Sequence, residues 1–460
     1  MTADPGSFRD PDSQLHVDDQ GRVLRALTPR AVERWDAVEP SAALRELVET
    51  GRIVRSTRLG AGALPGAAEV LEHERIPAIT YPYEWSFSML RDAALLELDV
   101  LRRLLDDGLI LSDGTLYNVA FRGPRPVFID VGSLRPADSG EPWAGYRQFC
   151  MQALFPLMLQ AFRGVSPRPW LRGAIEGITP AEVRALLRGR DLLRRGVPGH
   201  VVLHARLERR EARRRPGEVR KELAKAGFSA EIVKANADRL RRLVARLRWS
   251  PPASPWDGYH EAGVYDDAAH ERKQAFVSEV AATRRWTMAW DVGCHDGRYS
   301  RIVAPHAGSV IAFDTDEPTV DRLYRELRDE DVENVLPLVH DLADPSPGLG
   351  WGLRERRPLA DRARPDLVLM LAVIHHLAIG RSIPLPALLD WLRDLGATAV
   401  VEFPHPEDPM AASLIGRKDP GTHDAYTLEA FEAEVARRFT VERRELLPGG
   451  TRTLYLVTPT

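Results

Sequence analysis

The second half of the chain alternates short apolar runs with helical stretches, and this alternation constrains the fold more than any other feature. Helical stretches such as 317–328 and 385–395 separate the apolar runs, which are 287–292, 309–313, 335–339, 366–371 and 397–403. Strands separated by helices of this length form parallel βαβ units. At the end, a helix over 427–438 precedes two strands, 440–446 and 451–458, around Pro448-Gly-Gly450. The pattern predicts an α/β fold, a mostly parallel sheet closed by an antiparallel hairpin.

Polar residues follow three of these predicted strands. The segment Asp291-Val-Gly-Cys-His-Asp-Gly297 follows the first strand and precedes a helix, the context in which a glycine loop approaches a ligand. The second strand ends at Asp314, 23 residues after Asp291, where a carboxylate can accept two hydrogen bonds from a ribose diol. The third strand ends at His340-Asp341, which suits an adenine amino group.

These features make residues 257–460 resemble a class I S-adenosylmethionine (SAM)-dependent methyltransferase, with its Rossmann-like sheet and antiparallel sixth and seventh strands. The resemblance implies that Asp291 and Gly293 lie by the methionine end of SAM, in one cofactor loop with Cys294 and Gly297. It implies that Asp314 holds the ribose and Asp341 the adenine. A dinucleotide is the rival cofactor, but His295 stands where a middle glycine is usual, and a pyrophosphate needs that close approach more than SAM does.

Candidate catalytic residues follow the fourth and fifth strands. His375 and His376 come where the acceptor would enter, and Glu402 ends the fifth strand on the same rim. One histidine can deprotonate a hydroxyl near neutral pH; alternatively, both orient a loop. No local ligand spacing predicts a metal. Asp366, which begins the fourth strand, either stabilises a loop or acts directly in the site.

The segment before the glycine loop supplies one further candidate. Tyr265 lies on a predicted helix of the kind that often covers the cofactor in this fold, although a packing role is an equal alternative.

The first half, residues 13–180, is predicted to be an α+β domain. An amphipathic helix over 88–105 precedes Asp113, Asn118 and Asp130, whose spacing is similar to the catalytic loop and metal-binding Asp of protein-kinase-like folds. That resemblance implies that Asn118 and Asp130 hold Mg²⁺ with ATP. No lysine occurs before Lys221, so the usual phosphate-pairing lysine is missing. We expect a degenerate kinase-like domain that binds the acceptor; the alternative is a hairpin with turn and capping residues.

The ends of this first part have distinctive compositions. Residues 1–12 are polar and acidic, and we expect them to be disordered. Residues 181–250 are predicted to form a basic helical connector: 184–248 hold 20 Lys and Arg against 7 Asp and Glu. This is either a solvated face with salt bridges or a cradle for an acidic substrate or a phosphate-bearing carrier. The proline-rich break over 250–255 marks a domain boundary.

Composition excludes several classes of function. The 460 residues carry a net charge of −3, which does not favour a nucleic-acid partner. The two cysteines, Cys150 and Cys294, rule out a disulfide scaffold or a cysteine-based zinc site. The most apolar long stretch, 149–162, contains glutamines and a proline and predicts a buried helix rather than a membrane span. We expect a cytoplasmic protein; its oligomeric state is not predicted.

The whole chain also resembles a bacterial group of SAM-dependent methyltransferases related to host-specific nodulation proteins. The segments that carry this likeness are 76–90, 118–133 and 141–149. Together these features predict a SAM-dependent methyltransferase that acts on a small molecule or a modified glycan, with the N-terminal domain helping to recognise the acceptor. The alternatives are a bifunctional protein that also binds Mg–ATP and a non-catalytic SAM-binding regulator.

Overall fold

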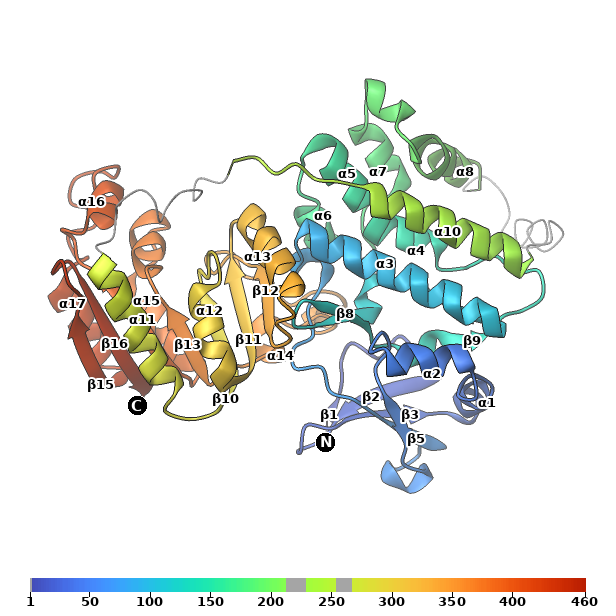
Figure 1. Cartoon of the computed structure of the whole chain (residues 1–460), viewed down its shortest axis with the longest axis horizontal. Coiled ribbons are helices and arrows are strands. Elements are labelled where there is room, and N and C mark those ends of the chain that lie inside the picture. Colours follow the sequence, from blue (N-terminus) through green and yellow to red (C-terminus); the bar gives the residue numbers. More distant parts are fainter. Residues whose placement is uncertain (1, 212–228, 254–266) are drawn as a thin grey trace. The chain divides into compact units, whose positions relative to one another are not determined.

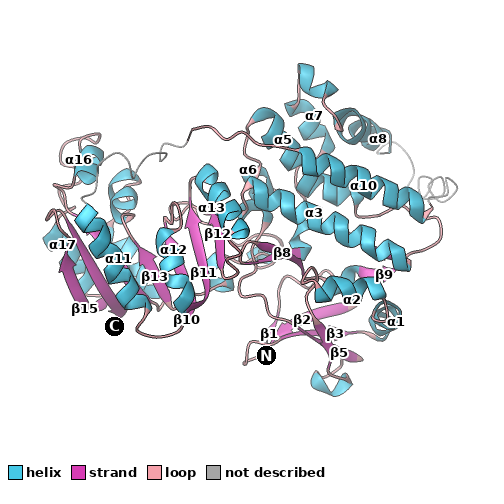
Figure 2. Ribbon diagram, in the orientation of Figure 1, coloured by secondary structure: helices cyan, strands magenta, loops and turns pink. Residues whose placement is uncertain are grey.

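The computed structural model describes residues 2–211, 229–253 and 267–460, and these fall into two compact units (Figures 1 and 2). Unit 1 contains residues up to 121, together with 126–251 and 347–357. Unit 2 contains 122–125, 252–346 and 358–460. The short segment 347–357 therefore belongs to unit 1, although it lies within the predicted methyltransferase half of the sequence.

Unit 2 is built on one seven-stranded sheet. Its strands are β10 (Trp286–Val292), β11 (Ala307–Asp314), β12 (Val335–Val339), β13 (Leu367–Met370), β14 (Thr398–Pro404), β15 (Phe439–Leu446) and β16 (Arg452–Pro459). Their order across the sheet is β12-β11-β10-β13-β14-β16-β15, and β16 alone runs antiparallel to its neighbours. This topology confirms the expected class I methyltransferase fold.

The strand positions follow from the apolar runs. The buried stretches of β10, β11, β12 and β13 read as nearly continuous apolar sequence because parallel strands of this type are covered on both faces. The connecting helices are α12 (Arg298–Val303), α13 (Glu317–Asp329) and α15 (Leu385–Asp394). Two more helices flank the sheet, α11 (Asp267–Ala281) before β10 and α17 (Leu428–Ala436) before β15.

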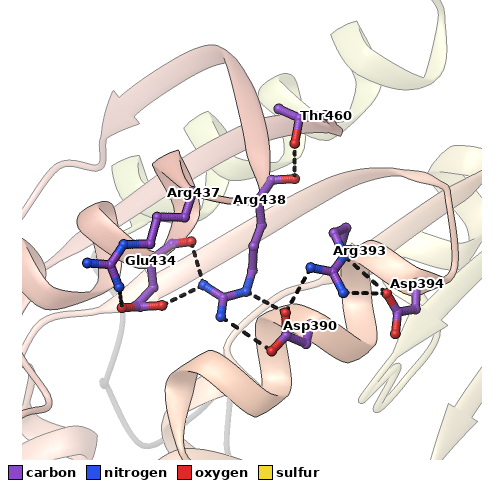
Figure 3. Close-up of polar contacts among 7 residues, drawn as sticks. All are labelled: Asp390, Arg393, Asp394, Glu434, Arg437, Arg438 and Thr460. Carbon is purple, nitrogen blue, oxygen red and sulfur yellow. Dashed lines mark hydrogen bonds and ion pairs between the residues drawn. The ribbon is translucent and has the colours of Figure 1, made fainter.

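An ion network joins α15 to the region that follows α17 (Figure 3). Arg438 binds Asp390 of α15 through its Nε at 2.7 Å, and it also pairs with Glu434 of α17. The carbonyl of Arg438 accepts a hydrogen bond from Thr460. The side chain of Arg438 is 12% exposed, so this network ties the end of the chain to two helices at a mostly shielded position.

Unit 1 begins with a five-stranded antiparallel sheet of order β1-β2-β3-β5-β4. The strands are β1 (Thr2–Ala3), β2 (Ser13–Val17), β3 (Val23–Leu27), β4 (Ser56–Arg58) and β5 (Glu69–His73). The helices α1 (Pro29–Val38) and α2 (Ala42–Glu49) lie between β3 and β4 in sequence. Residues 2–12 differ from the expected disorder because β1 pairs with β2, and Arg9 forms an ion pair with Glu355 at 2.7 Å.

The long amphipathic helix α3 (Phe87–Leu104) is followed by two small strand pairs. In one, β6 (Leu109–Leu111) pairs with β9 (Leu134–Pro136); in the other, β7 (Val119–Arg122) pairs with β8 (Arg125–Phe128). This confirms an α+β fold for unit 1. The apolar stretch 149–162 forms buried turns of helix, and no helix in the described ranges has both the length and the hydropathy needed to cross a membrane.

The expected connector does not stand apart from unit 1. Its helix α10 (Ala230–Arg246) packs along α3, as Figure 1 shows. Arg241 pairs with Asp99 at 2.5 Å and Lys234 with Asp106 at 2.9 Å, both across the α3–α10 contact region. The ion pairs explain the basic sequence of α10 as a solvated face with salt bridges.

Asp366 shows how the strand registers are fixed. Its carboxylate accepts hydrogen bonds from the backbone N–H groups of Thr287 and Met288, each at 2.9 Å. These two groups lie at the beginning of β10, at the opposite end of the strand from Asp291. Of the two alternatives for Asp366, the structure therefore supports the stabilising role.

We expect Asp366→Ala to lower the free energy of unfolding by about 1–3 kcal/mol, because two backbone donors lose their acceptor. Chemical denaturation would measure this, with Asp329→Ala at the exposed end of α13 as the control. Equal stabilities of the Asp366→Ala variant and the parent protein would contradict the assignment.

Candidate functional site

The candidate site of unit 2 lies at the carboxyl ends of β10, β11 and β12. These strands are parallel neighbours, so their carboxyl ends meet at one edge of the sheet. The glycine loop connects β10 to α12, Asp314 is the last residue of β11, and Asp341 follows β12 closely. In an open α/β sheet, ligands bind at this edge.

The loop depends on three residues with left-handed backbone conformations. Gly293 has a φ of 70°, and a Cβ atom there would lie 2.6 Å from the Val373 side chain. Gly297 has a φ of 72°, and its Cβ would lie 2.6 Å from Leu323. His295 also has a positive φ, 47°, which explains why a glycine is usual at this position. The backbone thus adopts the turn although the middle residue carries a side chain.

Asp314 ties this loop to β11. Its two oxygens accept hydrogen bonds from the backbone N–H groups of His295 at 3.1 Å and Asp316 at 3.0 Å. Burial raises the pKa of Asp314 above its ordinary value, although both hydrogen bonds oppose the rise. A carboxylate oxygen can accept more than one hydrogen bond, so both oxygens can also accept from a ligand diol.

Asp291 is buried more deeply than Asp314. It is 2% exposed, and the Ser300 hydroxyl donates to its Oδ2 at 2.5 Å. Burial raises the pKa of Asp291 to about 6, against the opposing effects of Ser300 and Lys273. Asp291 therefore fixes the start of α12 to the end of β10 beside the loop. Cys294 is buried in the core.

Asp341 lies beyond β12 with two partners in place. Its Oδ1 accepts the backbone N–H of Ala343, and Arg381 reaches its Oδ2, each at 2.8 Å. Arg381 is 58% exposed, so this ion pair is accessible to solvent. Tyr265, the remaining cofactor candidate, lies outside the described residues.

The two candidate histidines lie against each other, with ring centroids 4.0 Å apart. His375 is fully buried, and neither of its ring nitrogens has a hydrogen-bond partner within the described chain. His376 is partly exposed. Burial lowers the pKa of both histidines, which disfavours their protonated forms. Of the two, only His376 is accessible to an acceptor.

The structure places Glu402, a catalytic candidate from the sequence, inside a buried ion network and not on an open rim. It is fully buried, with Lys273 2.5 Å from Oε2 and Arg452 3.2 Å from Oε1. Burial disfavours its charge, but the two cations outweigh burial and hold the pKa of Glu402 below its usual value. Arg452 in turn binds Asp408 at 2.6 Å. Glu402 is thus the centre of a buried ion network.

Of the three candidate residues in unit 1, Asp113 and Asn118 contact each other directly, and Asp130 has a different partner. Asn118 donates a hydrogen bond to the Oδ1 of Asp113 at 2.9 Å. Burial, with Asp130 nearby, raises the pKa of Asp113 to about 7. Asp130 is bound instead by Arg25 of β3 at 2.8 Å, and Arg25 also donates to Ser13 and His73.

Within the described ranges, no three His, Cys, Asp or Glu side chains are arranged to hold a metal ion.

Arg25 was not among the residues that the sequence analysis identified. Its partners lie far from it in the sequence, so no local spacing of residues predicts these contacts.

The pKa of Asp291 makes stability depend on pH. Because the folded protein holds this proton more tightly than the unfolded chain, ionisation of Asp291 reduces stability as the pH rises from about 4 to about 6. Asp291→Asn keeps an acceptor for Ser300 and removes the ionisation.

We expect the free energy of unfolding of the Asn variant, relative to the parent, to increase over that range by about 2–3 kcal/mol. Urea denaturation at several pH values would measure it, with the exposed Asp329→Asn as the control. A difference for Asp291→Asn that does not change with pH would mean that the pKa of Asp291 is not raised.

Comparisons with known proteins were made on the sequence and on the fold. No protein-family model matches the sequence. Among solved structures, the N-methyltransferase NodS from Bradyrhizobium japonicum WM9 is 12% identical, with a TM-score of 0.32, covering 42% of this chain and 99% of that one. Magnesium protoporphyrin IX methyltransferase from Synechocystis PCC 6803, solved with bound SAM, is 14% identical, with a TM-score of 0.31, covering 49% of this chain and 91% of that one. Scores this low do not establish a shared activity.

The sequence comparison says more about the family of the chain, because the match spans both units. The nodulation protein NoeA of Rhizobium meliloti (strain 1021) is 34% identical over 468 residues, covering 98% of this chain and 94% of that protein. Such a match includes the α+β unit, the basic segment and the methyltransferase-fold unit together. The chain belongs to the family of the nodulation protein NoeA.

Proposed function

We propose that unit 2 binds SAM at the carboxyl edge of its sheet and transfers the methyl group to an acceptor. The observation that carries the proposal is the loop 293–297, closed onto Asp314 by the hydrogen bond from His295. This arrangement presents a carboxylate with spare acceptor capacity beside a tight backbone turn. A ribose diol and a nearby methionine group fit these two features.

Different residues of the site would bind different parts of the cofactor. Asp314 would accept hydrogen bonds from the ribose hydroxyls, and Asp341 from the adenine amino group. Gly293 and Gly297 keep the turn free of side chains, since a Cβ at either would collide with Val373 or Leu323. SAM supplies an electrophilic methyl group on a sulfonium, and its transfer needs mainly alignment with the acceptor atom.

The acceptor is proposed to be a small molecule or a modified glycan. Support comes from the relative's name, which connects that protein with nodulation, and from the methyltransferase fold of unit 2. Unit 1 would contribute to acceptor recognition. If the acceptor atom must lose a proton, His376 is the best placed base, because it is partly exposed whereas His375 is fully buried.

A second candidate function is Mg–ATP binding by unit 1, favoured by the bond between Asn118 and Asp113. Against it, Arg25 occupies the Oδ1 of Asp130 that a magnesium ion would need. The residues as arranged do not fit the metal, so a degenerate domain remains the preferred interpretation.

We expect SAM and S-adenosylhomocysteine to bind the full chain with micromolar affinity, and Asp314→Ala to weaken both by about 10- to 100-fold. The loss corresponds to hydrogen bonds between hydroxyls and a charged group. Isothermal titration calorimetry would measure it, with Asp329→Ala as the matched control. Absence of binding to the parent protein would refute the proposal. Binding without methyl turnover on any tested acceptor would favour a SAM-binding regulator.

For unit 1 we expect no heat of binding from Mg–ATP in the same experiment, because Arg25 already satisfies Asp130. The comparison variant is Asp130→Asn. Mg–ATP binding by the parent that is lost in Asp130→Asn would instead establish a second nucleotide site and a bifunctional protein.

A further inference from the structure

A cavity of about 400 Å³ opens in unit 1, away from the residues discussed so far. It is lined by Arg184 of α7 (Pro180–Leu186), Val202 of the π-helical turn Val197–Leu203, and Arg206 and Arg209 of α8 (His204–Glu211). Its other lining residues are Ala181 and Ala185. Three arginine side chains thus line one hollow with small apolar side chains, and none of the described residues that line it is acidic.

These three arginines differ in their partners from Arg194, Lys234 and Arg241 of the same segment. Arg194 pairs with Asp191, and Arg241 and Lys234 of α10 pair with acids of or beside α3. By contrast, Arg184, Arg206 and Arg209 form no ion pair in the described structure; Arg209 only donates its Nε to the Ala205 carbonyl at 3.2 Å. Salt bridges therefore account for Arg194, Lys234 and Arg241 but not for these three charges.

The local fold brings the three side chains to one place. Both α8 and the π-helical turn before it pack against α7. Arg206 and Arg209 are three residues apart, so they share one face of α8. A π-helical turn is a departure from the regular helix that is frequently found at functional sites. Like charges placed together repel one another, and a bound anion relieves that repulsion.

We propose that this cavity, hereafter the arginine cavity, binds a small soluble ligand that carries a phosphate or sulfate group. A guanidinium fork matches two oxygens of a tetrahedral oxyanion, and three such forks provide more donors than a single carboxylate requires. The volume is within the range of pockets for small molecules. The small side chains of Ala181, Ala185 and Val202 leave room for the part of the ligand that carries the anion. This inference does not depend on SAM binding by unit 2.

The test is calorimetry of the full chain with inorganic pyrophosphate and, separately, with inorganic sulfate. We expect saturable binding of at least one of them, weakened about tenfold in Arg184→Gln and in Arg206→Gln. Arg190→Gln is the matched control, because Arg190 is exposed and has no place in the cavity. Thermal unfolding and SAM binding of each variant would show that the fold is intact.

Three outcomes would overturn the inference. One is the absence of saturable binding of either anion. Another is equal weakening in Arg190→Gln, which would indicate a diffuse basic surface rather than a site. The third is binding of vesicles with phosphatidylglycerol, lost in Arg184→Gln, without binding of either free anion, which would indicate a membrane surface as the partner. Preference for pyrophosphate over sulfate, or the reverse, would identify which oxyanion the ligand carries.

Discussion

The buried ion network around Glu402 holds unit 2 in its fold. Lys273 comes from the helix before the first strand, Glu402 from β14, and Arg452 from β16. Arg452 also binds Asp408, whose carboxylate caps the helix Pro409–Ile415. Each side chain is at most 5% exposed, so any one left without its partners would carry an uncompensated charge into the core. The helix, the parallel strands and the terminal hairpin must therefore assemble together.

Much of the fold of unit 2 could be predicted, because short segments of the sequence specify its strands. Parallel strands covered on both faces are continuous apolar runs, so β12 lies where the pattern placed it. The cofactor candidates were recognisable for the same reason: Asp314 ends its strand and Asp341 lies two residues after its own. The ion network was not predictable in this way. Lys273 and Arg452 meet Glu402 only after the sheet has formed, and an isolated lysine in a helix looks the same whether it is solvated or buried.

In unit 1, contacts between residues distant in sequence were even harder to predict. The helix α3 and the β7–β8 hairpin follow from periodicity and turn residues. The environment of Asp130 could not be predicted in this way. Its partner Arg25 comes from β3, which is distant in the sequence, and Arg25 also donates hydrogen bonds to His73 and Ser13. Glu97 of α3 is 1% exposed and its carboxylate has no hydrogen-bond partner in the described chain; burial raises its pKa well above the ordinary value. A buried acid of this kind cannot be found by a search for motifs.

The assignment of residues 347–357 to unit 1 has a consequence for dividing the protein into fragments. The segment lies in sequence between β12 and β13, and its Glu355 holds Arg9 near the start of the chain. A gene fragment that encoded only the residues after 252 would carry this piece of the other unit and lack its anchor. Cutting the chain near residue 252 would separate Glu355 from Arg9, so a single cut cannot release unit 2 free of residues from unit 1.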